Sequence, residues 1–245
     1  MRIVLLAALA AALLLYPSGA MAGGGKLRVL VVTGGHDFER GPFFALFDSF
    51  RDISWREVQH PHANEMFAPD RRGEYDVVVF YDMPQAISEE EKRWLTETVR
   101  EGKGVVALHH TLGAYTAWPE YARLIGGKYL QGPETIDGVE WKASTYRDDV
   151  PHTVAIADRR HPITRGLDDF QIVDELYGGF WVSPRAHALL TVDHPLSGRV
   201  VGWTWKYGKA RVVYLQPGHG PTAYRDANYR TLVERSILWV ARKLR

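Results

Sequence analysis

The sequence contains no cysteine among its 245 residues. A chain without cysteine forms no disulfide, so its core alone must stabilise it, even in an oxidising compartment. The same absence excludes a cysteine nucleophile and a thiolate metal ligand. Any chemistry that this protein performs must therefore use imidazole, carboxylate or hydroxyl groups.

A strong net charge is also lacking, because 30 Lys and Arg residues stand against 29 Asp and Glu residues. No basic stripe with interleaved aromatic residues occurs, so nucleic acid is not expected as a partner. The composition, with 46% hydrophobic and 24% charged residues, is typical of a globular protein that is long enough for one large core.

The N-terminal apolar run is too short for a membrane-spanning helix. Arg2 precedes apolar residues 3–15, and Ala20-Met21-Ala22 ends the segment with small residues. A spanning helix needs about 20 apolar residues, whereas this pattern is typical of a cleaved secretory signal. We therefore expect a signal peptide over residues 1–22, one domain over residues 23–245, no lasting membrane anchor, and a periplasmic or extracellular protein.

The centre of the chain is organised around residues 102–113. The apolar run Val105–Leu108 follows Gly104 and ends at His109-His110, as a buried parallel strand would. Similar strands are predicted at residues 27–33 and 75–80, with helices near residues 42–50 and 88–101. This alternation predicts an α/β fold with a doubly wound, mostly parallel sheet.

The second half of the sequence contains more strands than helices, which predicts an antiparallel extension of the sheet. Loops are expected at residues 60–73 and, with a small antiparallel excursion as the alternative, at 130–152. The predicted elements there are helices at residues 118–125 and 229–244 and strands at 154–157, 170–173, 188–192, 200–205 and 212–215.

Polar side chains follow several of the predicted strands. Ligands of open α/β sheets bind outside the carboxyl ends of the strands, so we expect one shared cleft there. Histidine in such a cleft can transfer protons or bind a metal. A divalent metal is possible, but no His-x-x-x-His or comparable spacing marks its ligands. The candidates are His36, Asp82, His109, His110, Asp174, Glu175 and His219, with Trp118 as an aromatic wall for a sugar ring.

Seven sequence motifs occur in an order that resembles the trehalose-utilisation (ThuA-like) family, over residues 26–244. The resemblance implies a flavodoxin-like sheet with helices on both faces, as in class I glutamine amidotransferases. It also implies a role in carbohydrate catabolism, with 3-keto-glycosides as substrates. The motifs are LVVTGGH (30–36), YDVVVF (75–80), GVVALHH (104–110), YARLIGG (121–127), HPI (161–163), DELY (174–177) and YGK (207–209).

One departure from the amidotransferases restricts the chemistry. Those enzymes carry a cysteine after the central strand, where this chain has His109-His110-Thr111. Cysteine-dependent amidotransfer is therefore excluded, and no glycine-flanked serine elbow replaces it. Acid–base or metal-assisted chemistry remains.

The favoured function is an enzyme that starts an elimination beside the ketone of an oxidised glycoside. His109 or His110 is expected as the base and Glu175 as a further catalytic residue. His36, Asp82, Asp174, His219 and Trp118 are expected to contact the carbohydrate. The alternative is a non-catalytic sugar-binding module that uses the same cleft. The sequence determines neither the sugar nor the oligomeric state.

Overall fold

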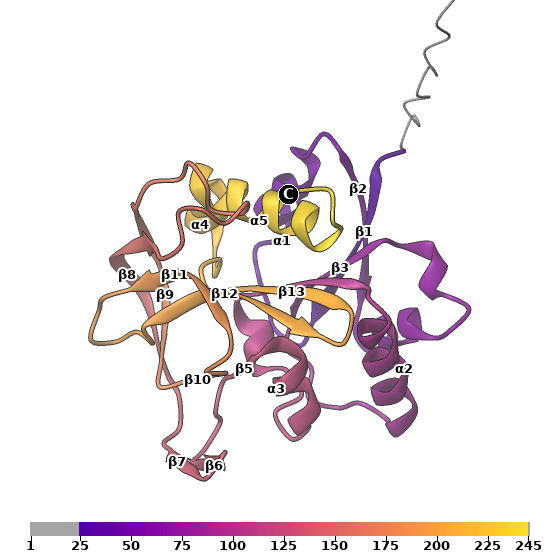
Figure 1. The fold of residues 1–245 in the computed structure, drawn as a ribbon, viewed down its shortest axis with the longest axis horizontal. Helices are drawn as coiled ribbons and strands as arrows, with labels where there is room; N and C mark the ends of the chain where they lie inside the picture. The colour runs from indigo at the N-terminus through magenta and orange to yellow at the C-terminus, as the bar shows by residue number, and fades with distance from the viewer. Residues whose placement is uncertain (1–24, 245) are drawn as a thin grey trace, which may run out of the picture.

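The computed structural model describes residues 25–244, so the expected signal peptide lies outside the described residues. A nine-stranded sheet runs through the molecule, with helices above and below it (Figure 1). Its strand order is β2-β1-β3-β4-β13-β12-β11-β8-β9.

The first half of the sheet is parallel. It consists of β2 (Ile53–Gln59), β1 (Leu27–Gly34), β3 (Val77–Asp82), β4 (Gly104–Leu108) and β13 (Ala210–Leu215). The order 2-1-3-4-5 of these strands is that of flavodoxin-like sheets, whose ligands bind at the reversal between the first and third strands. The carboxyl ends of β1, β3, β4 and β13 therefore meet at one edge.

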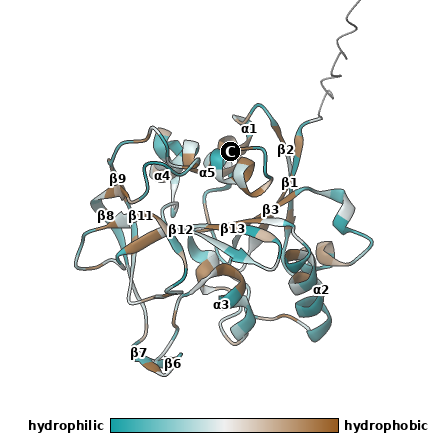
Figure 2. Cartoon of the chain, viewed as in Figure 1, coloured by the Kyte–Doolittle hydropathy of each residue, from teal (hydrophilic) through white to brown (hydrophobic). Residues whose placement is uncertain are grey.

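Both faces of β1, β3, β4 and β13 are covered, which explains their largely apolar sequences, whereas the edge strand β2 exposes polar residues. In β4, Val106 and Leu108 pack toward α1 (Arg40–Asp48), α4 (Pro221–Arg225) and α5 (Ala227–Val240). Val105 and Ala107 pack toward α2 (Glu89–Arg100) and α3 (Pro119–Ile125). Apolar residues concentrate in the central strands, whereas α2 exposes hydrophilic residues (Figure 2).

The second half of the sheet is antiparallel and is built from β8 (Thr145–Ile156), β9 (Phe170–Gly178), β11 (His187–Val192) and β12 (Val200–Tyr207). Strand β11 pairs with β12 along one edge and, along the other, with residues 154–156 of β8 alone. The rest of the β8–β9 hairpin, residues 145–153 and 171–178, continues past β11, and we call it the β8–β9 arm. This arm reaches the carboxyl end of β4, where Glu175 contacts His109.

Shorter elements complete the described chain. The turns are the 3₁₀ helices η1 (His62–Phe67), η2 (Arg72–Glu74) and η3 (His109–Gly113). Two small antiparallel pairs join β5 (Gly127–Lys128) to β10 (Trp181–Val182) and β6 (Glu134–Ile136) to β7 (Val139–Trp141).

The predicted fold class is confirmed. Helix α2 begins with a capping box formed by Ser88 and Glu91. Three predictions about loops and strand ends are wrong. Residues 60–73 contain η1 and η2 rather than only loop. Strand β8 begins at Thr145, not at residue 154, and β9 continues to Gly178 instead of ending at residue 173. The exposed first part of β8 carries polar residues on both faces, so it lacks the apolar pattern that marks a strand.

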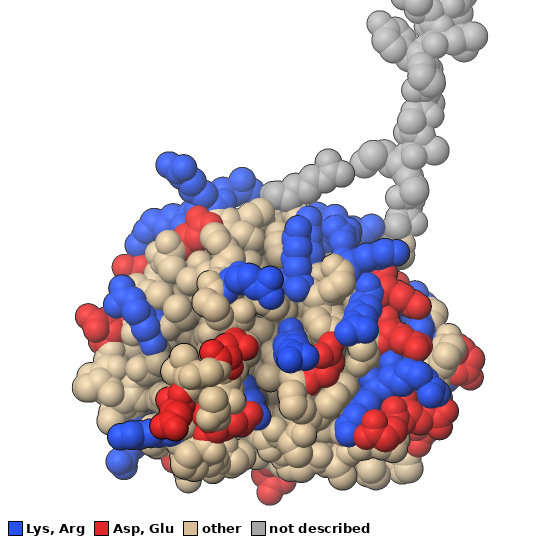
Figure 3. Space-filling model, turned by 60° about the horizontal axis from the view of Figure 1, so that its bottom comes forward, with Lys and Arg blue, Asp and Glu red and all other residues tan. Residues whose placement is uncertain are grey.

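On the face drawn in Figure 3, basic side chains lie among acidic ones rather than in one large patch. Among the described residues, no helix combines the length and the apolar character needed to cross a membrane.

Candidate active site

The site begins where β4 ends. His109 follows Leu108 with a φ of 49°, a left-handed conformation that is uncommon for residues other than glycine. The Tyr214 hydroxyl on β13 donates to the His109 carbonyl at 2.9 Å. This turn directs the side chains of His109 and His110 to different surroundings. Such backbone conformations concentrate at functional sites.

His109 is completely buried, and both of its ring nitrogens are engaged. Nδ1 lies 2.6 Å from the Gln216 carbonyl oxygen, to which it donates. Nε2 lies 2.8 Å from Glu175 Oε2, 2.9 Å from the Tyr177 hydroxyl and 3.1 Å from His219 Nδ1. His109 is therefore fixed in place by β13 and by the β8–β9 arm.

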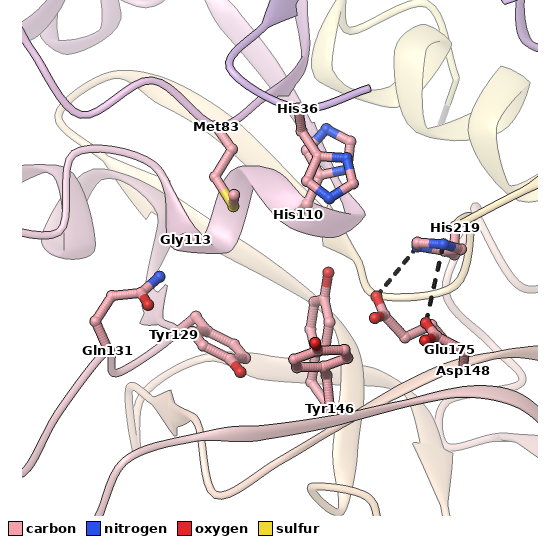
Figure 4. A pocket seen from close by; sticks show the side chains of 11 residues that line it. His36, Met83, His110, Gly113, Tyr129, Gln131, Tyr146, Asp148, Glu175 and His219 are labelled. Carbon is pink, nitrogen blue, oxygen red and sulfur yellow. Dashed lines mark ion pairs between the residues drawn. The ribbon is translucent and has the colours of Figure 1, made fainter. Parts of the chain in front are cut away.

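Beside this cluster lies a cavity of about 440 Å³, within the size range of small-molecule sites. Stacked His36 and His110 form one side of it, and Glu175, Asp148 and His219 form another, as Figure 4 shows. Tyr129, Tyr146 and Gln131 lie along a third side. The lining residues are His36, Met83, His110, Gly113, Tyr129, Gln131, Tyr146, Asp148, Glu175, Tyr177 and His219.

His110 is the buried histidine of the cavity wall, and only 3% of it is exposed. Its ring stacks on His36 with 4.5 Å between centroids. Within residues 25–244, neither of its ring nitrogens has a hydrogen-bond partner. Burial lowers the pKa of His110 well below its usual value, and the neighbouring histidines lower it further. The side chain is therefore a neutral imidazole at neutral pH.

On one side of the cavity, Asp148 and Glu175 of the β8–β9 arm lie beside His219. Burial opposes ionisation of Glu175, but hydrogen bonds with His109 and His219 outweigh it and hold its pKa well below the usual range. The hydrogen bond with Glu175 raises the pKa of His219. The pKa of Asp148 is also raised, chiefly by a hydrogen bond shared with Glu175. Glu175 is therefore an ionised carboxylate between two imidazoles.

The loop after β13 positions His219. Asp174 is buried and accepts hydrogen bonds from the backbone N–H groups of Gly218 at 2.6 Å and His219 at 3.0 Å. Gly218 has a φ of 126°, and a Cβ there would overlap the Tyr229 hydroxyl and lie 2.8 Å from its ring carbon Cζ. Glycine is required at this position for both reasons.

The structure brings His36, His110, Glu175 and His219 together on one cavity, with His109 directly behind them. Three of the residues expected to contact a carbohydrate do not line it. Asp82 is the last residue of β3 and is fully buried, where its carboxylate holds Thr111 at 2.6 Å and His60 at 2.8 Å. Asp174 supports the His219 loop instead.

Trp118 also lies outside the cavity lining, because it precedes α3 and stacks on Tyr121. Asp174 and Glu175 were predicted to follow a strand, but both lie within β9. Sequence reasoning missed Tyr129, Gln131, Tyr146 and Asp148, which lie in or beside the predicted loop and have no motif to mark them. Tyr177 belongs to the DELY motif (174–177), yet no role was predicted for it.

The comparisons with known proteins agree with this fold. No curated protein matches the sequence. A crystal structure of a ThuA-like protein from Parabacteroides merdae is similar, with a TM-score of 0.73 and 22% identity, covering 88% of this chain and 90% of that one. A ThuA-like protein from Bacteroides uniformis has a TM-score of 0.66 and 20% identity, covering 92% and 95%.

A β-galactosidase from Bacillus circulans sp. alkalophilus is similar over 88% of this chain but only 31% of its own length, with a TM-score of 0.55 and 12% identity. At these identities the three likenesses show the fold alone. The family model described as "ThuA: Trehalose utilisation" matches residues 28–240. That match covers nearly the whole described chain, so the protein belongs to the ThuA family, whose description suggests a role in carbohydrate catabolism.

Proposed function

We propose that the protein is an exported enzyme that cleaves oxidised glycosides by elimination beside a ketone. The observation that carries this proposal is His110, a buried histidine on the cavity wall whose ring nitrogens have no partner within residues 25–244. Because burial lowers its pKa, His110 is neutral at neutral pH, and a neutral imidazole is the form that accepts a proton from a bound substrate. Family membership supports carbohydrate as the substrate class.

A ketone at C3 of a sugar acidifies the hydrogen on C2. In the proposed reaction, His110 takes this proton, and the electron pair forms a double bond between C1 and C2. The bond between C1 and the aglycone oxygen breaks, and that oxygen takes a proton from Asp148. Negative charge develops on the ketone oxygen during the reaction, and the imidazole of His219, whose pKa is raised by its hydrogen bond with Glu175, stabilises it.

The two sides of the cavity suit these two proton transfers. His36 stacks on His110 at one side, and Asp148 lies on the β8–β9 arm at the other. The shift in the pKa of Asp148 favours its protonated form compared with an ordinary aspartate. A sugar ring between the two sides would have a base on one side and an acid on the other. His109 is buried behind the cavity, so it positions Glu175 rather than reacting itself.

Export of the protein is proposed from the N-terminal sequence, in which Arg2, the short apolar run and Ala20-Met21-Ala22 form a secretory signal. The substrate would then be met outside the cytoplasm. The absence of cysteine is compatible with an oxidising compartment.

The enzyme proposal is tested with 3-keto-trehalose and the p-nitrophenyl 3-keto-α- and β-glucosides, with the unoxidised sugars as controls. We expect turnover of an oxidised sugar only. His110→Gln should retain the parent's melting temperature within a few degrees and lower turnover by about 10²–10⁴-fold. His62→Gln is the matched control, because its side chain is 76% exposed and lies outside the cavity.

Two results would contradict this proposal. Equal turnover by His110→Gln and His62→Gln would show that His110 is not the base. Saturable binding of the oxidised sugars with no turnover by the parent protein would identify a sugar-binding module instead of an enzyme.

A further inference from the structure

Three side chains from distant parts of the chain place their donor atoms on one small triangle. His109 follows β4, Glu175 lies on β9, and His219 lies in the loop after β13. His109 Nε2 lies 2.8 Å from Glu175 Oε2 and 3.1 Å from His219 Nδ1, and the third side of the triangle is 3.2 Å.

These separations match the spacing of ligands around a small cation. A cation about 2.1 Å from each donor would separate neighbouring donors by about 3.0 Å at right angles, or about 3.4 Å at tetrahedral angles. The three observed distances lie at or near this range. Two imidazoles and one carboxylate on one face of a cation form the ligand set of many catalytic zinc and non-haem iron sites, which leave other positions open.

Hydrogen bonds around the triangle orient its two histidines. His109 Nδ1 donates to the Gln216 carbonyl at 2.6 Å, so the lone pair of a neutral ring lies on Nε2, inside the triangle. Asp174 holds the backbone at His219. The hydrogen bond of His109 Nδ1 to a backbone carbonyl is typical of histidines that bind metals. Within the described chain, His219 Nε2, on the outer side of its ring, has only Asp148 nearby, at 4.0 Å.

A fourth group faces the triangle. The Tyr177 hydroxyl lies 2.9 Å from His109 Nε2, so it can donate a hydrogen bond to that nitrogen when no cation is bound. A cation at the triangle would replace this hydrogen bond and would be the shared partner of all three donor atoms.

The triangle also has an open side. Glu175 and His219 line the cavity of about 440 Å³, and the His219 side chain is 39% exposed. A cation there would be reached from the cavity, and its remaining positions would be available to water or to oxygen atoms of a ligand.

We infer that His109 Nε2, Glu175 Oε2 and His219 Nδ1 form a binding site for one divalent first-row transition cation, such as Zn²⁺ or Co²⁺. Imidazole donors favour these ions over Mg²⁺ and Ca²⁺, which prefer oxygen ligands. The site rests on its own geometry and does not depend on the reaction proposed above.

The test is titration of the chelator-treated mature protein with Co²⁺ and Zn²⁺, followed by calorimetry and by the visible absorption of bound Co²⁺. We expect one tight equivalent in the parent protein and in His62→Gln. His219→Gln and Glu175→Gln should lose at least about 100-fold in affinity. Mg²⁺ should not displace the bound ion.

Circular dichroism of each variant checks that it is folded. Misfolding is least expected for His219→Gln, because the His219 side chain is only partly buried. Equal Co²⁺ affinity in His219→Gln and the parent, or no saturable binding by the parent, would overturn the inference in favour of a cluster held by a shared proton. Because no sugar is present, cation binding without turnover would leave this site standing and contradict only the proposed reaction.

Discussion

Gly218 allows the most quantitative prediction. Its backbone has a positive φ, and its Cα lies so close to the Tyr229 side chain that a Cβ would not fit. Its φ of 126° is poorly accessible to residues with a Cβ, which costs about 1–3 kcal/mol. A Cβ would also overlap the fully buried Tyr229 side chain, and overpacking of this kind costs about 1–3 kcal/mol. Gly218→Ala should therefore lower the free energy of unfolding by about 2–6 kcal/mol in total.

The contact term can be separated from the backbone term by removing the Tyr229 hydroxyl. In the described part of the chain this buried hydroxyl has no hydrogen-bond partner, so Tyr229→Phe alone should be neutral or stabilising by up to about 2 kcal/mol. In the double variant the nearest ring carbon is still only 2.8 Å from the new Cβ. We therefore expect partial rescue, with a coupling of about 0.5–2 kcal/mol.

Urea unfolding of the parent, both single variants and the double variant measures these terms. Gly218→Ala should also displace His219, because the N–H groups of both residues donate to Asp174. The reasoning is refuted if Gly218→Ala is as stable as the parent, or if its loss of stability is the same with and without the Tyr229 hydroxyl.

Three further predictions concern other regions. N-terminal sequencing of exported protein should begin at Gly23, and a mature chain that retains Met1 would contradict the signal peptide. Asp82→Ala leaves buried Thr111 and His60 without their acceptor, and should cost about 2–4 kcal/mol in urea unfolding, whereas exposed Asp70→Ala should cost almost nothing. Burial opposes ionisation of Glu57, but hydrogen bonds from Arg40, Thr33 and Gln59 outweigh it and lower its pKa below 4.5. The stabilisation from Glu57 is therefore present above that pH and lost as pH falls through the folded-state pKa. Glu57→Gln should lower stability by about 0.5–1 kcal/mol at pH 7, with no difference from the parent in strong acid. An equal difference at both pH values would show that the stabilisation does not come from the ionised carboxylate.

The parallel half of the fold was predictable because its sequence is determined by burial on both faces. Runs such as Val77–Phe80 and Val105–Leu108 have few alternatives to a covered strand, and the polar residues that follow them mark the edge of the sheet. His36, His110 and His219 were placed near one another by this rule alone.

The β8–β9 arm was not predictable in the same way. Its outer residues are exposed on both faces, so no periodic apolar pattern distinguishes strand from loop. Tyr146 and Asp148 reach the cavity only because the long hairpin returns over the end of β4, and no local signal in the sequence encodes that return. The positions of residues 109, 175 and 219 after predicted strands placed them in one cleft, but nothing in the sequence indicated that their side chains contact one another.

The distance along the chain between these three residues has a consequence for unfolding. His109 lies 66 residues before Glu175 and 110 residues before His219. Whatever joins the three side chains therefore closes two long loops, as a disulfide would, in a protein that has none. Separating them releases the chain entropy of both loops at once, so occupancy of the site and resistance to proteolysis should rise and fall together.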